Sequence, residues 1–307
     1  MSIEVSNGEP CRICPRGCRV NRDGGERGFC GAGAEVLVPH YGPHFGEEPP
    51  ISGTNGSGNV FFSPCNLRCV FCQNHQISHN AVGRPMTVDG LSDIFLELQD
   101  RQVHNINLVS PTPYIPRIAA AIRTAKAKGL KIPVVYNTNA YESSEALVLL
   151  DGLIDIYLPD FKYWHESAGR RLSKATRYPE TAKSAITEMK RQVGDLHVDQ
   201  GLARQGLLIR LLVLPGGLSG TRPALRWIKD TLGPQTYISL MSQYYPLYQA
   251  QRYPMVARPI RKEEYEEVID FALDQGFQNI FGQDMESASL FIPDFDKEEP
   301  FDRLLKV

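Results

Sequence analysis

The sequence predicts an α/β fold, a partial (β/α)6 TIM-like barrel that carries a small cysteine-rich N-terminal extension. The first observation behind this prediction is that short apolar runs alternate six times with segments whose apolar residues recur at helical spacing. Such alternation is typical of a parallel sheet with right-handed crossovers, and six units are too few for a closed eight-stranded barrel. The second observation is that all seven cysteines lie before residue 73, which sets the N-terminal segment apart.

The six expected strands are short and mostly apolar, as buried parallel strands are. They are placed at residues 59–63, 106–109, 132–136, 153–158, 207–214 and 236–240. The carboxyl ends of the strands meet on one side of such a barrel, and the active sites of these folds lie there. Polar residues that directly follow a strand are therefore the first candidates for function.

The segments between the strands have helical periodicity. The clearest is the first, where Val88, Leu91 and Phe95 lie three or four residues apart, and the second ends at Gly129, a typical C-terminal stop. Helices are expected at residues 88–103, 114–128, 142–150, 178–194, 221–232 and 262–275.

The alternation divides the chain into three parts. Residues 1–58 are rich in Gly, Pro and Cys and have few apolar runs, so this extension needs a staple such as a metal in order to fold. Residues 59–283 are expected to form the barrel. The tail at residues 284–307 is acidic and contains proline, and we expect it to pack irregularly on the surface.

Composition and charge exclude several classes of protein. Of the 307 residues 42% are hydrophobic and 22% are charged, which is near the average for globular proteins. The net charge of −2 provides no broad attraction to nucleic acid or to an anionic membrane. No apolar run reaches the ~18 residues that cross a bilayer, and the N-terminus lacks the pattern of a signal peptide. We therefore expect a soluble cytoplasmic protein with neither nucleic acid nor membrane as a partner.

Three cysteines follow the first expected strand on one loop. Cys65, Cys69 and Cys72 can hold three corners of a 4Fe–4S cluster. Such clusters normally take four cysteine ligands, and no fourth cysteine lies on this loop or after it in the chain. One iron would then be open to another ligand. The alternatives are a structural zinc site with a ligand from elsewhere, or three unrelated thiols.

The other four cysteines, Cys11, Cys14, Cys18 and Cys30, lie in the extension that is poor in apolar residues. Four thiolates of this kind predict a structural zinc site, because tetrahedral sites staple small folds. A second iron–sulfur cluster that relays electrons is the main alternative, and free thiols or transient disulfides are a third.

The cysteine loop, with Phe71 before its last cysteine, resembles the signature of the radical S-adenosylmethionine (SAM) enzymes. Over residues 11–260 the chain resembles more narrowly the PflX-like relatives of pyruvate formate-lyase activating enzyme. The shared motifs are Cys11-Arg-Ile-Cys14-Pro-Arg-Gly-Cys18, Gly46-Glu-Glu-Pro-Pro-Ile-Ser-Gly53, the cysteine loop, Ser110-Pro-Thr-Pro, Tyr136-Asn-Thr-Asn139, Pro159-Asp-Phe-Lys162 and Leu214-Pro-Gly.

The resemblance implies an enzyme that cleaves SAM reductively at a 4Fe–4S cluster to a 5′-deoxyadenosyl radical. It also implies an electron donor such as flavodoxin or ferredoxin, and a glycyl radical enzyme as the partner to be activated. A radical SAM enzyme that acts on a small molecule or on another protein is the alternative. A non-catalytic iron–sulfur or zinc binding module is the alternative of a different class.

The resemblance also implies cofactor contacts from the strand ends, where Phe71 flanks the cluster. Ser110 and Thr112 follow the second strand, at the place where relatives often carry a Gly-Gly-Glu run that holds the SAM amino group. Asn137 and Asn139 follow the third strand and are expected near the ribose or the methionine carboxylate, although amides also serve in ordinary turns.

Charged residues complete the set of candidates. Asp160 and Lys162 follow the fourth strand on the same side, either beside the SAM pocket as in the activating enzymes or as a simple ion pair. Arg210 lies in the apolar fifth strand and needs a carboxylate partner if it is buried. The SAM carboxylate or Asp160 would serve, and a structural pair elsewhere is the alternative.

Overall fold

The computed structural model describes residues 10–285 and 292–301. Its central feature is a run of parallel strands, each hydrogen-bonded to the next along the chain. The strands are β2 (Ser57–Ser63), β4 (Ile106–Val109), β5 (Val134–Thr138), β6 (Ile156–Pro159), β8 (Leu202–Leu212), β9 (Tyr237–Met241) and β10 (Ile280–Gly282). The predicted α/β fold is confirmed, and the first six of these strands are the six expected from the sequence.

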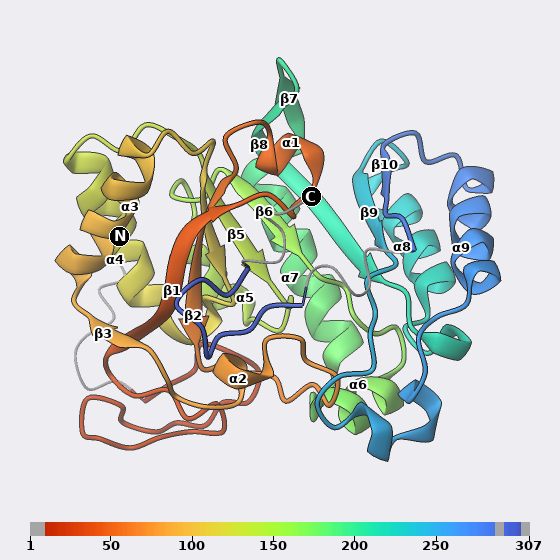
Figure 1. Ribbon diagram of the computed structural model, residues 1–307, viewed down its shortest axis with the longest axis horizontal. Coiled ribbons are helices and arrows are strands. Elements are labelled where there is room, and N and C mark those ends of the chain that lie inside the picture. The colour runs from red at the N-terminus through yellow and green to blue at the C-terminus, as the bar shows by residue number, and fades with distance from the viewer. Residues whose placement is uncertain (1–9, 286–291, 302–307) are drawn as a thin grey trace.

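Helices cover the outside of the sheet, with α3 and α4 on one flank and α8 and α9 on the other (Figure 1). Their bounds are α3 (Val88–Asp100), α4 (Ile115–Ala127), α5 (Ser144–Val148), α7 (Tyr178–Val193), α8 (Thr221–Leu232) and α9 (Lys262–Asp274). The apolar stripe of α3 is buried as the periodicity predicts, and its first turn is capped by Thr87, which accepts a hydrogen bond from the Gly90 amide. A further helix, α6 (Glu166–Ser173), was not expected.

The N-terminal part of the chain extends the sheet with antiparallel strands that the sequence reading did not contain. Strand β1 (Val36–His44) pairs with β2, and the short β3 (Arg84–Met86) pairs with β1 at the edge. The prolines of β1 and its irregular register between Leu37 and His40 hide the alternation by which strands are recognised. The expected boundary near residue 58 thus falls between two paired strands. A hairpin of β7 (His197–Asp199) with β8 is likewise new.

A short helix, α1 (Pro49–Ser52), closes the interior of the barrel at the amino ends of the strands. Its Ile51 is fully buried against inward side chains of β5, β6 and β8, and Asn105, just before β4, donates a hydrogen bond to the Ile51 carbonyl at 2.7 Å. The alternate residues of the same strands pack against the outer helices. The cysteine loop lies at the opposite end, after β2. The interior of the barrel is therefore accessible from the carboxyl ends of the strands.

The described part of the C-terminal tail crosses in front of β1 and β2 (Figure 1). Phe295 and Phe301 pack on Phe61 of β2 with ring centroids 5.2 and 5.6 Å away. Gln76 of α2 (His75–Ser78) donates hydrogen bonds to Asp294 and Asp296. This segment contains neither helix nor strand, in agreement with the expected irregular packing.

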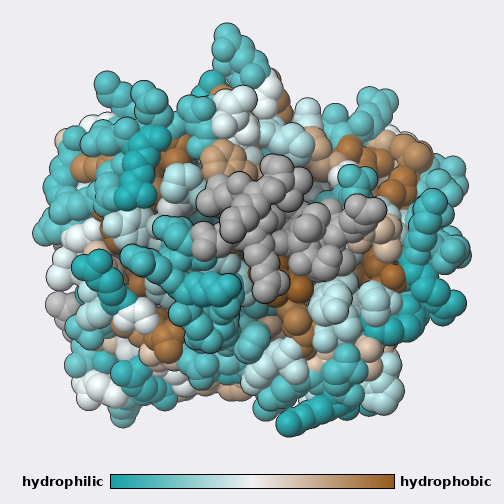
Figure 2. Space-filling model, in the orientation of Figure 1, coloured by the Kyte–Doolittle hydropathy of each residue, from teal (hydrophilic) through white to brown (hydrophobic). Residues whose placement is uncertain are grey.

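The visible face of the molecule is mostly hydrophilic, with separate small apolar patches (Figure 2). Among the described residues, none of the helices is both long enough and apolar enough to cross a bilayer.

Candidate active site

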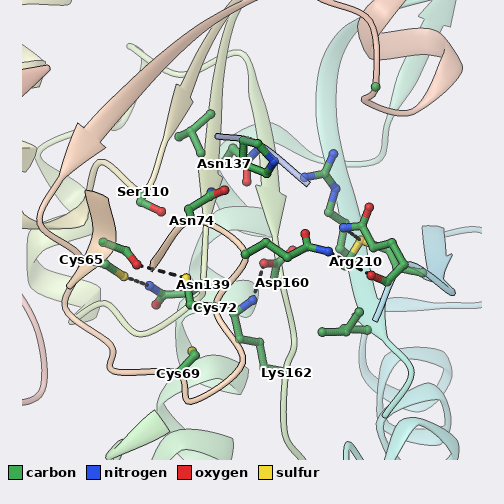
Figure 3. A pocket seen from close by; sticks show the side chains of 18 of the residues that line it. Cys65, Cys69, Cys72, Asn74, Ser110, Asn137, Asn139, Asp160, Lys162 and Arg210 are labelled. Carbon is green, nitrogen blue, oxygen red and sulfur yellow. Dashed lines mark hydrogen bonds and ion pairs between the residues drawn. The ribbon is translucent and has the colours of Figure 1, made fainter. Parts of the chain in front are cut away.

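A cavity of about 230 Å³ lies at the carboxyl ends of the parallel strands. Side chains from far apart in the sequence meet in it (Figure 3). Of the residues predicted from the sequence, it is lined by Cys65, Cys69, Phe71, Cys72, Ser110, Asn137, Asn139, Asp160, Lys162 and Arg210. The fold therefore brings together almost all of the site residues that were predicted from the strand ends, because the carboxyl ends of parallel strands converge.

Thr112 is the exception and corrects the prediction. It does not line the cavity but is buried behind β5, where its hydroxyl donates to the carboxylate of Glu142 at 2.7 Å. The backbone turns at Ser110, whose φ is 59°, and Thr112 already begins the short 3-10 helix η1 (Thr112–Tyr114) that leads into α4. The chain has therefore left the cavity before it reaches Thr112.

The cysteine loop is held by main-chain hydrogen bonds to helices on two sides. The Cys65 amide donates to the Ser78 carbonyl of α2 at 2.9 Å, and the Val70 amide donates to the Leu172 carbonyl of α6 at 2.8 Å. Burial raises the pKa of Cys65 to about 11 and that of Cys72 to about 12, and it also raises the pKa of Cys69. These thiols are neutral without a cation, and a bound metal would displace their protons.

The residues present fit a 4Fe–4S cluster with SAM beside it. Three thiols of one loop face the same cavity, and among the described residues the Oδ1 atom of Asp160, which also lines the cavity, has no hydrogen-bond partner. Within the described residues no three Cys, His, Asp or Glu side chains surround a single point as ligands of one metal ion do. A cluster does not require that, because each cysteine binds a different iron.

Asp160 and Lys162 form the ion pair expected from their spacing. The Lys162 Nζ lies 2.6 Å from the Asp160 Oδ2, and both side chains are largely buried. Burial acts to lower the pKa of Lys162, but the charge of the Asp160 carboxylate and its hydrogen bond outweigh burial, and the pKa is raised. Lys162 is thus a fixed positive charge on the wall of the cavity, within electrostatic reach of the cluster loop.

Arg210 has partners other than the two that were favoured from the sequence. Its guanidinium is bound by Glu48, with distances of 2.8 and 2.6 Å, and by Glu47. Burial acts to raise the pKa of Glu47, but Arg210 holds it at about 2. Arg210 therefore has a structural carboxylate pair, as in the alternative stated above, while Asp160 pairs with Lys162 instead. Both glutamates line the cavity, and only their place in the Gly46–Gly53 motif signalled them.

Three side chains contact the sulfurs of the cysteine loop, and the sequence did not indicate any of these contacts. Asn139 was expected to contact the ribose or a carboxylate, but its Nδ2 lies 3.3 Å from the Cys65 sulfur. Ser173 and Ser78 contact the Cys69 and Cys72 sulfurs at 2.9 and 3.0 Å. These serines end α6 and α2, and only the packing of those helices against the loop makes them neighbours of sulfur.

The extension with Cys11, Cys14, Cys18 and Cys30 packs directly behind the cluster loop. Arg16 donates to the Asn66 carbonyl at 2.8 Å, and Arg68 donates in return to the Cys30 carbonyl, also at 2.8 Å. Each cysteine group thus contributes one arginine that donates a hydrogen bond to the main chain of the other group. In the described chain the four thiols are not gathered around one point, so a metal in this extension stays a prediction.

Comparisons with known proteins agree with this fold and cavity. The sequence model of the Radical SAM superfamily matches residues 59–200. The uncharacterized protein MJ0674 of Methanocaldococcus jannaschii is 31% identical over 285 residues, which cover 89% of this chain and 77% of that protein.

Solved structures share the fold at low identity. Methylornithine synthase (PylB) has a TM-score of 0.50 at 14% identity, and the alignment covers 81% of this chain and 77% of PylB. The hydrogenase maturase HydG of Carboxydothermus hydrogenoformans has a TM-score of 0.51 at 12% identity, covering 72% of this chain. This chain spans about half the length of HydG, with 52% covered.

Proposed function

Since this chain belongs to the radical SAM superfamily and is an enzyme of that class, we propose that Cys65, Cys69 and Cys72 hold its 4Fe–4S cluster and that SAM occupies the same cavity. The observation that carries this assignment is that three loop thiols share one cavity with a carboxylate oxygen of Asp160 that has no partner in the described part of the chain. Because the loop itself carries only three cysteines, one iron is left open for SAM.

With both groups bound, one electron breaks a carbon–sulfur bond of the SAM sulfonium and yields methionine and a 5′-deoxyadenosyl radical, which takes a hydrogen atom from the substrate. The chain itself positions these groups and keeps water away from them. Phe71 packs edge-on against Tyr244 at 5.3 Å and walls the cavity beside the loop. Asp160 and Lys162 present a fixed charge pair on the wall formed by β6.

The test is anaerobic reconstitution followed by iron analysis and an assay of 5′-deoxyadenosine release with a chemical reductant. The intact chain should bind about four irons at the loop and release 5′-deoxyadenosine, whereas Cys69→Ala should lose both. Cys18→Ala, the same change at a cysteine outside the cavity, should still release 5′-deoxyadenosine. Retained SAM cleavage by Cys69→Ala would refute the assignment, and a binding module would consume no SAM in any form.

The substrate that we propose is a glycine Cα in a flexible loop of a glycyl radical enzyme. The Asp160–Lys162 pair and the Leu214-Pro-Gly turn support it by resemblance to activating enzymes. A peptide also needs an accessible mouth, and Tyr245, 38% exposed, lines this cavity. Reduced enzyme and SAM, incubated with candidate partners, should give the doublet of a glycyl radical in electron paramagnetic resonance.

A small-molecule substrate is the second candidate, and one observation favours it. Pro293 and Phe301 of the C-terminal tail line the same cavity, so the tail takes part in enclosing it. If no candidate protein gives the doublet, while a metabolite accelerates 5′-deoxyadenosine release and exchanges hydrogen with it, this second function replaces the first. In either case the electron donor is proposed to be a flavodoxin or a ferredoxin.

A further inference from the structure

Each thiol of the cluster loop receives a hydrogen bond from a different element of the barrel. Asn139, after β5, donates to Cys65 at 3.3 Å (Figure 3). The Ser173 hydroxyl of α6 donates to Cys69 at 2.9 Å, and the Ser78 hydroxyl of α2 lies 3.0 Å from the Cys72 sulfur. We propose that these three side chains are positioning residues that set the reduction potential of the cluster. The inference rests on the proposed function.

The direction of each hydrogen bond is determined by its surroundings. A sulfur bound to iron carries no proton, so it can only accept. The amide of Asn139 is oriented by two other contacts, because its Oδ1 accepts from the Tyr141 amide and its Nδ2 also donates to Asn66. Its N–H group therefore faces the sulfur of Cys65 and cannot be exchanged for the oxygen without loss of both contacts.

Ser173 is part of a short chain of hydroxyls. Its Oγ lies 2.6 Å from the hydroxyl of Tyr163 as well as 2.9 Å from the Cys69 sulfur. A serine has one proton to donate, and that proton goes to the sulfur, so Tyr163 must be the donor to Ser173. Ser173 and Tyr163 are fully buried, so water does not compete for either contact. This chain strengthens the hydrogen bond to Cys69.

The expected effect follows from the charge that reduction adds. An added electron increases the negative charge on the cysteine sulfurs, and a hydrogen bond to a more negative acceptor is stronger. Donors at the sulfurs therefore stabilise the reduced state more than the oxidised state and raise the potential of the cluster. Ser78 and Asn139 line the cavity but are only 6% and 5% exposed, so they too are largely shielded from bulk water. The donors make the cluster easier for a protein reductant to reduce.

The experiment is a reductive titration of the reconstituted full chain, followed by electron paramagnetic resonance of the reduced cluster, with iron content measured in parallel. Ser173→Ala and Ser78→Ala should each lower the midpoint potential. A tenfold loss in the reduction equilibrium is about 59 mV for one electron. The double variant should add the two shifts, because the serines contact different sulfurs. Tyr163→Phe should give a smaller shift in the same direction.

Ser92→Ala is the matched control, since Ser92 of α3 is a fully buried serine whose hydroxyl has no hydrogen-bond partner among the residues that the structure describes. It should keep the wild-type potential. Full iron content with unchanged potential in both serine variants would overturn the inference alone. Loss of iron from both, but not from Ser92→Ala, would overturn it too, because it would assign the hydroxyls to cluster assembly. A wild-type chain that binds no cluster would instead refute the proposed function.

Discussion

Arg210 and Glu48 are joined by two hydrogen bonds inside the barrel, from Nε to Oε1 at 2.8 Å and from Nη2 to Oε2 at 2.6 Å. The arginine lies near the carboxyl end of β8, and the glutamate lies just before α1, 162 residues away in the chain. The pair thus connects the segment that leads into α1, at the amino ends of the strands, to the wall of the cavity. Glu47 binds the same guanidinium, so this cluster holds two carboxylates and one cation.

We expect Arg210→Met to destabilise the protein by about 3–5 kcal/mol, because it leaves Glu47 and Glu48 buried without their cation. The free energy of unfolding, from denaturant titration of the metal-free chain, measures this. Arg222→Met is the control, since Arg222 and its partner Glu267 are exposed and such pairs contribute about 1 kcal/mol or less. If both variants lose the same small free energy of unfolding, the interior pair does not stabilise the fold.

The N-terminal extension should be released from the cluster loop by Arg68→Ala. Arg68 donates to the carbonyls of Phe29 and Cys30, and the Cys30 side chain is only 6% exposed. Without these bonds the metal-free chain should open more often at this contact, and a thiol reagent should modify Cys30 faster. Peptide mapping by mass spectrometry gives the rate. Arg101→Ala, at an exposed arginine, should leave it unchanged, and an equal rate in both variants would contradict the expected docking.

Glu142 should make the stability of the chain depend on pH. Burial raises the pKa of Glu142 to about 7, although Thr112 and Thr138 donate to it. The folded chain holds this proton more tightly than the unfolded chain, whose pKa is ordinary. The free energy of unfolding from this group therefore falls as pH rises from about 4.5 to about 7, by about 3 kcal/mol at most.

Glu142→Gln should remove that part of the pH dependence and make the variant more stable than the wild type at pH 8. Thermal unfolding midpoints of the metal-free chain between pH 5 and pH 8 measure the difference. Glu145→Gln, at an exposed position on α5, should follow the wild type. If Glu142→Gln and Glu145→Gln give parallel curves, the buried carboxylate is not the titrating group.

The four N-terminal cysteines should hold about one zinc per chain, and their role should be stability more than chemistry. The segment is poor in apolar residues and needs a staple. Metal analysis after anaerobic reconstitution measures the zinc, and Cys14→Ala should lose it together with several degrees of thermal stability. About eight irons per chain, with a second cluster signal that disappears in Cys14→Ala, would instead support an electron relay.

Much of the fold follows from local patterns in the chain. The six parallel strands and their helices were placed within a few residues, because apolar periodicity reports which face of an element is buried. Strand β10 was not predicted, since its three residues are too few to show an apolar pattern. Strand β1 was not predicted either, because its prolines and bulge interrupt the alternation of apolar and polar residues.

The sequence by itself indicated the cysteine loop, because its three cysteines lie within eight consecutive residues and need no tertiary contact to be recognised. It also determined which strand ends converge, since parallel strands share one carboxyl side. Only the tertiary structure decided that Glu48 neutralises Arg210 and that Ser173 donates to Cys69 from 104 residues away. Such contacts depend on how whole elements pack, and a buried charge or hydroxyl binds whichever partner that packing brings within reach.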